Sequence, residues 1–305
     1  MRVAATSSAA EQLVSANIVR STGWKFFPPS HIEEVAAFNP DLVYLGGVYI
    51  GNYSDWQGYR AILGDARRVI MHWYGSDVVQ VGQFHREGSK GIIDWLNSER
   101  FLHIAPSGPL RQELVETLGI ETGDPINVPA EKVFGDISLP AGFVVGCYMP
   151  PQRQKFFNMK IIEKALSPRE DLRILFYHWL PLMEKLEYKG TNAEMRFCLS
   201  REEYEKTLAD CSCLLRIPAH DADSISAAEF LMSGRPVVSN HDLPMWPRLV
   251  NEQMEAPALV EAVISAKDIP VSAAVREFYR DRWDPAKFKA RLAERVKVKW
   301  PEVEL

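Results

Sequence analysis

The sequence predicts two α/β domains, each built on a mainly parallel β-sheet. Short apolar runs alternate with amphipathic stretches through both halves of the chain, as strands and helices do in such folds. The 305 residues correspond to about two domains. Residues 121–142 are rich in Pro, Gly and Asp and lack periodicity, which is typical of a linker. We therefore expect Rossmann-like domains at 1–139 and 140–280, followed by a C-terminal segment at 281–305.

The composition is that of a globular protein, with 47% hydrophobic and 25% charged residues. The net charge of −5 argues against non-specific nucleic-acid binding through bulk charge. We see neither a leader with an apolar core nor an apolar run long enough to span a membrane. The four cysteines show no zinc-binding spacing, so we expect no metal, a reducing compartment and a cytoplasmic location.

In the first half, apolar runs predict strands near 2–6, 41–51, 67–78 and 101–107. A helix is expected over 108–120, because its apolar residues recur at helical spacing and Gly119 supplies a stop.

In the second half, strands are expected near 143–148, 172–178, 193–198, 213–218 and 235–240, and helices at 156–166, 200–211 and 222–234. Ser200 and Glu203 form the pattern of a capping box. Gly234 is placed to end its helix. Asp284 and Pro285 are typical of the start of a last helix.

Residues 217–240 carry the most informative pattern. Asp221 lies in the loop after a strand, and Glu229 lies eight residues later on the following helix. Two carboxylates at one strand end can accept hydrogen bonds from the hydroxyls of a sugar or ribose. The helix begins with small residues around Ser224 and Ser226, so its first N–H groups can face a diphosphate. The alternative is an ordinary capped helix with a solvated acid.

This stretch resembles the donor-binding motif of retaining GT-B glycosyltransferases of family 4, in which an acid, seven residues and a Glu precede a small-Gly-x-Pro-Val-Val turn. The sequence here has Asp221, seven residues, Glu229 and then MSGRPVVSN. The resemblance implies that Asp221 faces the donor sugar and Glu229 the ribose, with Ser224, Ile225 and Ser226 beside the donor. The family usually has Glu at the first position. The shorter side chain of Asp221 would alter the contacts with the donor sugar hydroxyls, so the motif does not identify the sugar.

Residues 143–166 resemble the strand, loop and helix that open the second domain of that family. The resemblance implies that Arg153 and Lys155 neutralise the donor diphosphate, although their spacing departs from the family's Arg-x4-Lys. A leaving diphosphate requires fixed positive charge. The alternative is a pair of solvated cations beside a helix.

Residues 69–78 resemble an HW-x-G-x-D loop found in some family members. His72 would lie near the donor sugar, and Tyr74, Gly75 and Asp77 would line the acceptor side of a cleft between the domains. The alternative for His72 is a hydrogen-bonded histidine at a strand end. Gly47 belongs to a glycine-containing loop that either surrounds a ligand or forms a plain turn. His178 and Trp179 either line a pocket for the donor base or serve in packing.

The resemblance as a whole implies a GT-B fold with two sheets facing a cleft and a last helix that crosses back to the first domain. It implies transfer of a sugar from a nucleotide-diphosphate-sugar, with a UDP-sugar expected, to a hydroxyl acceptor with retention of configuration and without a metal or other cofactor. The catalytic set would be His72, Asp221 and Glu229. A GT-B-like sugar-nucleotide epimerase and a non-catalytic sugar-nucleotide-binding protein are the alternatives.

The acceptor is left open among glycan, lipid-linked glycan, protein, small molecule and modified nucleic acid. Residues 276–299 hold nine Lys or Arg and four acids. This segment is either a solvated helix face or a peripheral contact with anionic lipid or nucleic acid.

Overall fold

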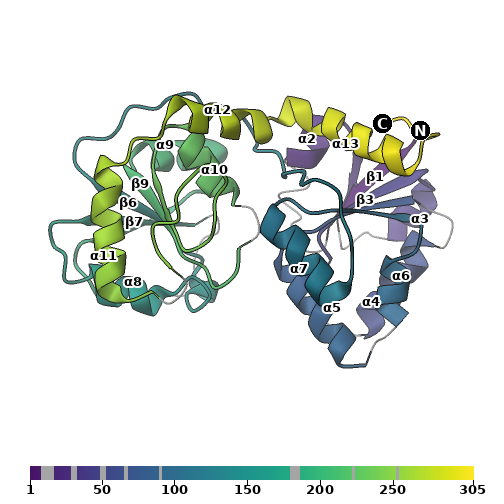
Figure 1. The fold of residues 1–305 in the computed structure, drawn as a ribbon, viewed down its shortest axis with the longest axis horizontal. Helices are drawn as coiled ribbons and strands as arrows, with labels where there is room; N and C mark the ends of the chain where they lie inside the picture. Colours follow the sequence, from purple (N-terminus) through teal and green to yellow (C-terminus); the bar gives the residue numbers. More distant parts are fainter. Residues whose placement is uncertain are drawn as a thin grey trace. The chain divides into compact units, whose positions relative to one another are not determined.

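A computed structural model of the chain divides into two compact units, residues 1–132 with 282–305 and residues 133–281 (Figure 1). The structure describes residues 1–7, 17–28, 33–48, 53–64, 68–88, 91–178, 186–221, 224–251 and 254–305. The predicted fold class is confirmed, because each unit is built on a five-stranded, all-parallel sheet with helices around it.

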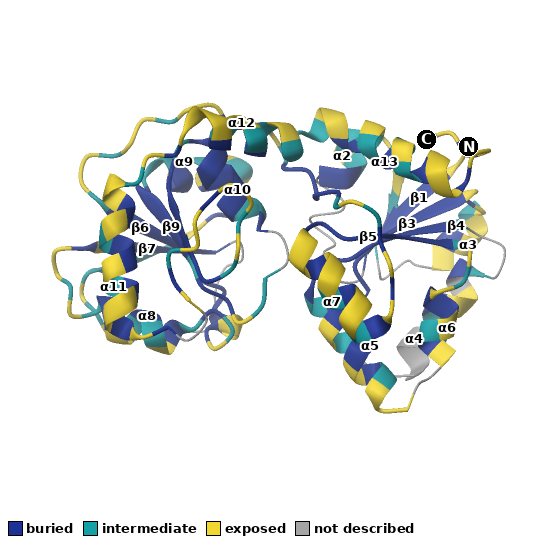
Figure 2. Ribbon diagram, viewed as in Figure 1, coloured by how far each residue is buried: buried dark blue, intermediate teal, exposed yellow. Residues whose placement is uncertain are grey.

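The sheet of the first unit has the order β2-β1-β3-β4-β5. Its strands are β1 (Val3–Thr6), β2 (Lys25–Phe27), β3 (Leu42–Gly46), β4 (Arg68–His72) and β5 (Phe101–Ile104). Every residue of the central strands β1 and β3 is buried, as expected for parallel strands covered on both faces, and every residue of the edge strand β5 is buried as well (Figure 2). The predicted strands at 41–51 and 67–78 end earlier than expected, at Gly46 and His72, because the chain turns there.

The helices of the first unit are α2 (Val19–Thr22), α3 (Glu33–Phe38), α4 (Tyr53–Leu63), α5 (Ser76–Arg86), α6 (Gly91–Leu96), α7 (Gly108–Leu118) and α13 (Pro285–Lys299). The predicted start of the last helix is confirmed, since Asp284 caps α13 by accepting from the N–H of Ala286 and Pro285 is its first residue. The buried side chains Phe288, Leu292 and Val296 form the inner face of α13.

The sheet of the second unit has the order β10-β9-β6-β7-β8. Its strands are β6 (Val144–Tyr148), β7 (Arg173–His178), β8 (Ala193–Phe197), β9 (Cys213–Arg216) and β10 (Val237–Ser239). Its α-helices are α8 (Met159–Leu166), α9 (Arg201–Ala209), α10 (Ile225–Met232), α11 (Ala256–Ser265) and α12 (Ala273–Arg282). The last residue of α12 belongs to the first unit.

The local stop and start signals of the second unit are confirmed. Ser200 and Glu203 form a complete capping box on α9. Gly234 takes a φ of +83° just after α10, a conformation that glycine adopts without the penalty of a Cβ. Helix α8 begins three residues later than the predicted residue 156, because the turn Pro151–Arg153 and further turns precede it.

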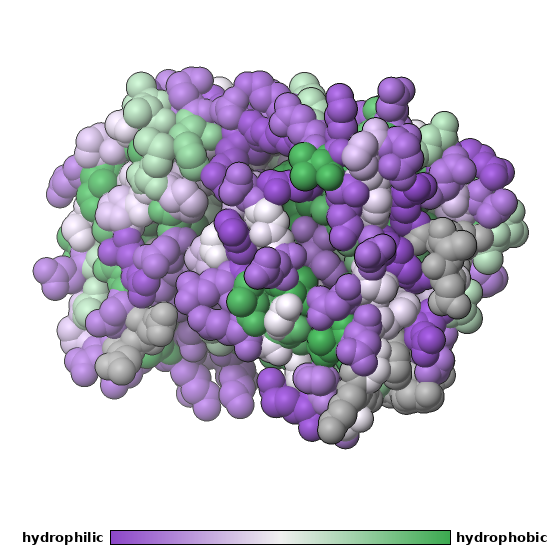
Figure 3. Space-filling view, turned by 45° about the vertical axis from the view of Figure 1, so that its right-hand side comes forward, coloured by the Kyte–Doolittle hydropathy of each residue, from purple (hydrophilic) through white to green (hydrophobic). Residues whose placement is uncertain are grey.

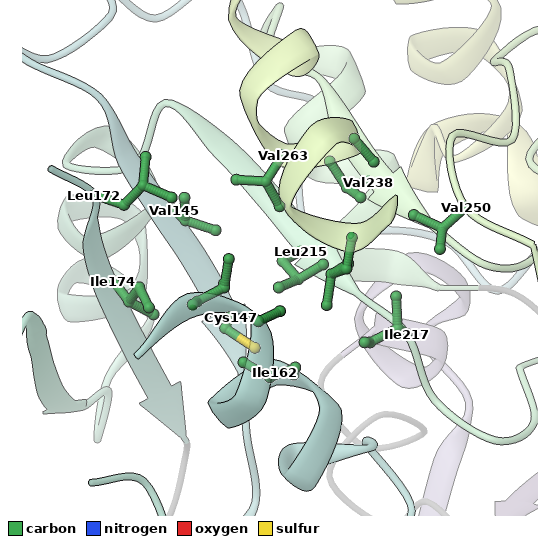
Figure 4. Close-up of a cluster of buried hydrophobic side chains, with 14 of the residues drawn as sticks. Val145, Cys147, Ile162, Leu172, Ile174, Leu215, Ile217, Val238, Val250 and Val263 are labelled. Carbon is green, nitrogen blue, oxygen red and sulfur yellow. The ribbon is translucent and has the colours of Figure 1, made fainter. Parts of the chain in front are cut away.

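The core of the second unit lies between the sheet and helices α8 and α11. Figure 4 shows Val145 and Cys147 of β6 and Leu215 of β9 converging with Ile162 of α8 and Val263 of α11. These side chains are almost fully removed from water, and burial of each is worth about 1.5–3 kcal/mol for a Val-, Leu- or Ile-sized group. All four cysteines are buried and free.

The surface is more polar than this core. Figure 3 shows a face on which hydrophilic side chains predominate and apolar ones form smaller patches. No helix within the described residues combines the length and the apolar character that crossing a membrane requires.

Candidate functional site

The carboxyl edge of the second sheet gathers the polar residues that the sequence singles out. Because all five strands are parallel, the loops after β6, β9 and β10 start from the same edge. These loops are tied to one another. The N–H of Ala219 donates to the carbonyl of Phe156 at 2.7 Å, and the Asn158 side chain donates to the carbonyl of Ile217 at 2.8 Å. From the other side, the Asn240 side chain donates to the carbonyl of Pro218 at 3.0 Å.

Asp221 lies in the loop after β9, and its carboxylate is held by an arginine that the sequence analysis did not single out. Arg216, the last residue of β9, donates from Nε to Oδ2 at 2.6 Å and from Nη2 to Oδ1 at 2.9 Å. Burial alone would lower the pKa of Arg216, but Asp221 raises it above its ordinary value. The pair is a bidentate, charge-assisted contact at the strand end.

Glu229 lies on α10, where it is almost fully buried with 2% of its side chain exposed. Its Oε1 lies 2.8 Å from Nη2 of Arg201, the first residue of α9. Burial raises the pKa of Tyr204, and the nearby Glu229 carboxylate raises it further. The Arg201 guanidinium lies over the rings of Phe134 and Tyr204. The two acids of the motif therefore have different surroundings and different arginine partners.

Helix α10 begins between these two acids. The Ser224 hydroxyl accepts from the N–H of Ala227 at 3.1 Å and lies 3.1 Å from the hydroxyl of Ser226. Ile225 and Ser226 are half-buried in the first turn.

Arg153 and Lys155 lie in the loop after β6, and both side chains are exposed. Arg153 is near Tyr148, the last residue of β6: burial raises the pKa of Tyr148, while Arg216 and Arg153 lower it. Tyr148 therefore lies within electrostatic reach of Arg153 in the loop after β6 and of Arg216 at the end of β9. The structure thus brings the loop of Arg153 and Lys155 beside the loop of Asp221.

Aromatic rings lie at the same edge. The ring of His178, at the end of β7, stacks on Tyr148 at 6.0 Å between centroids, and His178 is buried. Trp179, the other residue that the sequence suggests for a base pocket, lies outside the described residues.

In the first unit, His72 ends β4 and is completely buried. Its Nδ1 lies 2.7 Å from the Tyr44 hydroxyl, and its ring stacks on Phe288 of α13 with an interplanar angle of 4°. Burial lowers the pKa of His72 to about 3, and the main chain of Ile126 offsets this in part. The imidazole is therefore neutral at physiological pH, and Tyr44 is a partner that the sequence did not indicate.

The loop after β4 is organised by Asp77. Its carboxylate accepts from the N–H groups of Gly75 at 2.8 Å, Val78 at 3.0 Å and Tyr74 at 3.1 Å, and from that of Val48 after β3 at 3.4 Å. Burial raises the pKa of Asp77 to about 6, and these four N–H groups oppose the rise. Gly75 has a φ of +105°, which permits the sharp turn into α5.

Tyr74 and Gly47 lie near His72 in the same unit. The Tyr74 ring is 5.4 Å from that of His72, and the N–H of Gly47 donates to the His72 carbonyl at 2.8 Å. The structure therefore brings the four residues predicted around His72 together, but their polar groups are largely engaged with one another. Within the described part of the chain, no cluster of three or more His, Cys, Asp or Glu has the arrangement of a metal site.

No protein-family model matches the chain, and no curated protein matches it in sequence. Solved structures do resemble it in fold. The sucrose-phosphate synthase from Thermosynechococcus elongatus superposes with a TM-score of 0.69 at 10% identity, over 99% of this chain and 100% of that one.

Two further neighbours are informative. TarM superposes with a TM-score of 0.52 at 11% identity, over 83% of this chain and 54% of TarM, so the chain spans about half of that protein. A structure of S. aureus TarM contains UDP and alpha-GlcNAc-glycerol. A candidate UDP-N-acetylglucosamine 2-epimerase from Listeria monocytogenes superposes with a TM-score of 0.55 at 12% identity, over 100% of this chain and 98% of that one. At these identities the likeness establishes the fold alone, which is the GT-B fold that glycosyltransferases share.

Proposed function

We propose that the protein is a glycosyltransferase that moves a sugar from a nucleotide-diphosphate-sugar, a UDP-sugar in the first instance, to a hydroxyl acceptor with retention of anomeric configuration. The observation that carries the proposal is the carboxyl edge of the second sheet. There the exposed Arg153 and Lys155, the Asp221–Arg216 pair and the start of α10 come from neighbouring loops of one sheet.

In this proposal, Arg153 and Lys155 stabilise the charge that develops on the leaving diphosphate, and no metal is needed for that step. Asp221 accepts hydrogen bonds from the sugar hydroxyls. Glu229 serves the ribose, either directly or through Arg201, which covers its carboxylate. Ser224, Ile225 and Ser226 supply main-chain and hydroxyl groups beside the donor.

His72 has a different place in the proposal. Because it is buried behind Tyr44 and Phe288, it acts as a neutral imidazole that supports the acceptor-side loop formed by Gly47, Tyr74, Gly75 and Asp77. The acceptor itself is open, and we place the reaction in the cytoplasm. The charged residues of 276–299 are a candidate for contact with an anionic partner.

The test is isothermal titration calorimetry with UDP, GDP and ADP. We expect one nucleotide to bind, and the double variant Arg153→Gln with Lys155→Gln to weaken its binding by about tenfold or more, since a hydrogen bond to a charged group is worth about 1.5–3 kcal/mol. Lys160→Gln is the matched control, because Lys160 is an exposed cation on the adjacent helix α8. If both variants lose the same nucleotide affinity, the loop contributes only non-specific positive charge to binding.

A sugar-nucleotide epimerase is the second candidate, favoured by the fold likeness to the Listeria protein. The two functions differ in a simple respect. An epimerase changes the sugar of its nucleotide-sugar without an acceptor, whereas a transferase releases the nucleoside diphosphate. Proton NMR of the nucleotide-sugar incubated with the protein alone distinguishes the new sugar spin system of an epimerase from the free nucleotide and free sugar that slow transfer to water produces.

A further inference from the structure

The Arg216–Asp221 pair is built more rigidly than a surface ion pair. Two parallel N–H···O contacts of 2.6 and 2.9 Å join the groups, and their side chains are only 13% and 14% exposed. The arginine belongs to a strand and the aspartate to the loop that leaves it, five residues later. The contact therefore fixes where the loop acid points relative to the sheet.

Arg216 is itself held in place. Its guanidinium lies over the Phe157 ring at 5.5 Å from the centroid, and Tyr177 and Tyr148 contribute to its electrostatic surroundings. The loop between the two partners is anchored as well, because the carbonyls of Ile217 and Pro218 each accept a side-chain hydrogen bond. Rotation of Asp221 away from Arg216 would therefore leave a buried cation without its partner.

A carboxylate has about four lone-pair positions, and a bidentate arginine occupies one on each oxygen. Each oxygen of Asp221 thus keeps capacity for one further donor. A preoriented acceptor of this kind suits a pair of hydroxyls on one sugar ring, because ordering a flexible acid would otherwise reduce affinity. The Asp221 side chain is one methylene shorter than that of glutamate, and its contact with Arg216 restricts the rotation that remains.

We propose that Arg216 is a positioning residue for the donor sugar, acting through Asp221 and not through the diphosphate. This inference rests on the proposed function, since it requires a nucleotide-sugar to bind at this edge. Arg216 thus governs the additional affinity that the sugar gives a nucleotide-sugar over its nucleoside diphosphate. The affinity for the nucleoside diphosphate alone does not depend on Arg216.

The experiment measures both parts by calorimetry, with the nucleoside diphosphate that the wild type binds and with its nucleotide-sugars. In Arg216→Lys, which keeps a point charge but loses the planar fork, we expect nucleotide-sugar affinity to fall about tenfold, as loss of one charge-assisted hydrogen bond predicts. Nucleoside diphosphate affinity should stay within about twofold, the change expected when no direct contact is lost.

Arg169→Lys is the matched control. Arg169 and Asp171 make a bidentate pair of the same type in the same unit, but before β7, at the amino edge of the sheet. Its affinities for both ligands should match those of the wild type. Arg216→Gln keeps Asp221 and one side-chain amide donor beside it but loses the charge and the planar fork. It should fold with weakened sugar recognition and unchanged nucleoside diphosphate affinity, and it tests the inference even if Arg216→Lys does not fold.

The outcomes separate the two proposals. If the wild type binds no nucleoside diphosphate or nucleotide-sugar, the proposed function and this inference both fail. If the wild type binds them and both Arg216→Lys and Arg216→Gln recognise the sugar normally, only the inference fails, because the pair is then merely structural. A parallel loss for the nucleoside diphosphate in Arg216→Lys would also overturn it, since Arg216 would then act on the diphosphate.

Discussion

The ion pair between Glu229 and Arg201 is a feature of the candidate site that the local sequence pattern does not show. The sequence predicts an acid on the helix that follows the Asp221 loop, and the structure places it there. It also buries that acid against an arginine 28 positions earlier. No local spacing rule relates the two positions, because their contact depends on the packing of α9 and α10 on the same sheet.

We predict that Glu229→Gln lowers the free energy of unfolding by about 2 kcal/mol, because the partly buried Arg201 loses the more deeply buried of its two carboxylate partners, Glu229 and Glu205. Urea denaturation measures the change. The double variant Arg201→Met with Glu229→Gln should recover part of the loss. If the effects of the two single variants simply add, the ion pair does not contribute to stability in the way described.

His72 gives a second prediction at this scale, because its pKa is lowered from 6.5 to about 3 by burial. The unfolded chain binds a proton near pH 6.5 and the folded chain does so only near pH 3. Stability is therefore complete above pH 6.5 and falls as the pH drops, by about 1.4 kcal/mol per pH unit over that window.

Denaturation of the wild type and of His72→Asn at pH 7, 6 and 5 measures this slope. The variant should lose less stability between pH 7 and pH 5 than the wild type by about 2 kcal/mol. His103 is a suitable internal comparison, since burial lowers its pKa to about 4 and it remains in both proteins. Identical slopes would mean that burial does not lower the pKa of His72 and that the imidazole gains its proton over the same pH range in the folded and unfolded chain.

At the scale of elements, the local signals in the sequence were sufficient for most of the second unit. The capping box at Ser200 and Glu203, the glycine after α10 and the apolar runs of β6, β7 and β9 all depend on short-range chemistry. The short strand Lys25–Phe27 and helices such as α5 and α6 of the first unit were not predicted. These elements are short, and helices of this length depend on packing against the sheet for their stability.

Arg235 is an element-scale feature that the sequence did not reveal. It is fully buried, and its guanidinium donates to the carbonyls of Cys211 at 2.7 Å, Ser138 at 2.9 Å and Ala209 at 3.1 Å. The side chain therefore joins the segment before β6 to the end of α9 and the approach to β9. In the sequence it looks like an ordinary residue of the small-Gly-x-Pro turn.

We predict that Arg235→Met lowers the free energy of unfolding by about 3 kcal/mol, because several buried carbonyls lose their donor. Arg173→Met is the control, since the Arg173 side chain is 61% exposed and its loss should change stability by less than about 1 kcal/mol. Urea denaturation compares the two. Equal effects would mean that water replaces the guanidinium at these carbonyls.

At the scale of the whole molecule, the alternation of strands and helices was enough to predict two parallel α/β sheets, and the fold likeness agrees with that class. The order of strands within each sheet was not predictable, because it depends on crossover connections and not on local pattern. The same limit applies to the candidate site. Asp221, Arg153 and Lys155 could be identified by motif, whereas Arg216 and Tyr148 become relevant only once β6 and β9 are neighbours.

The central claim is that this fold transfers sugar from a nucleotide-sugar donor. Its most direct test is release of free nucleoside diphosphate from a panel of UDP-, GDP- and ADP-sugars, with water as the acceptor of the sugar, followed over time with the wild type and with the Arg153→Gln, Lys155→Gln double variant. The account predicts release from one nucleotide-sugar, greatly slowed in the double variant and unchanged in Lys160→Gln. Release from no nucleotide-sugar, or release that is insensitive to the double variant, would contradict it.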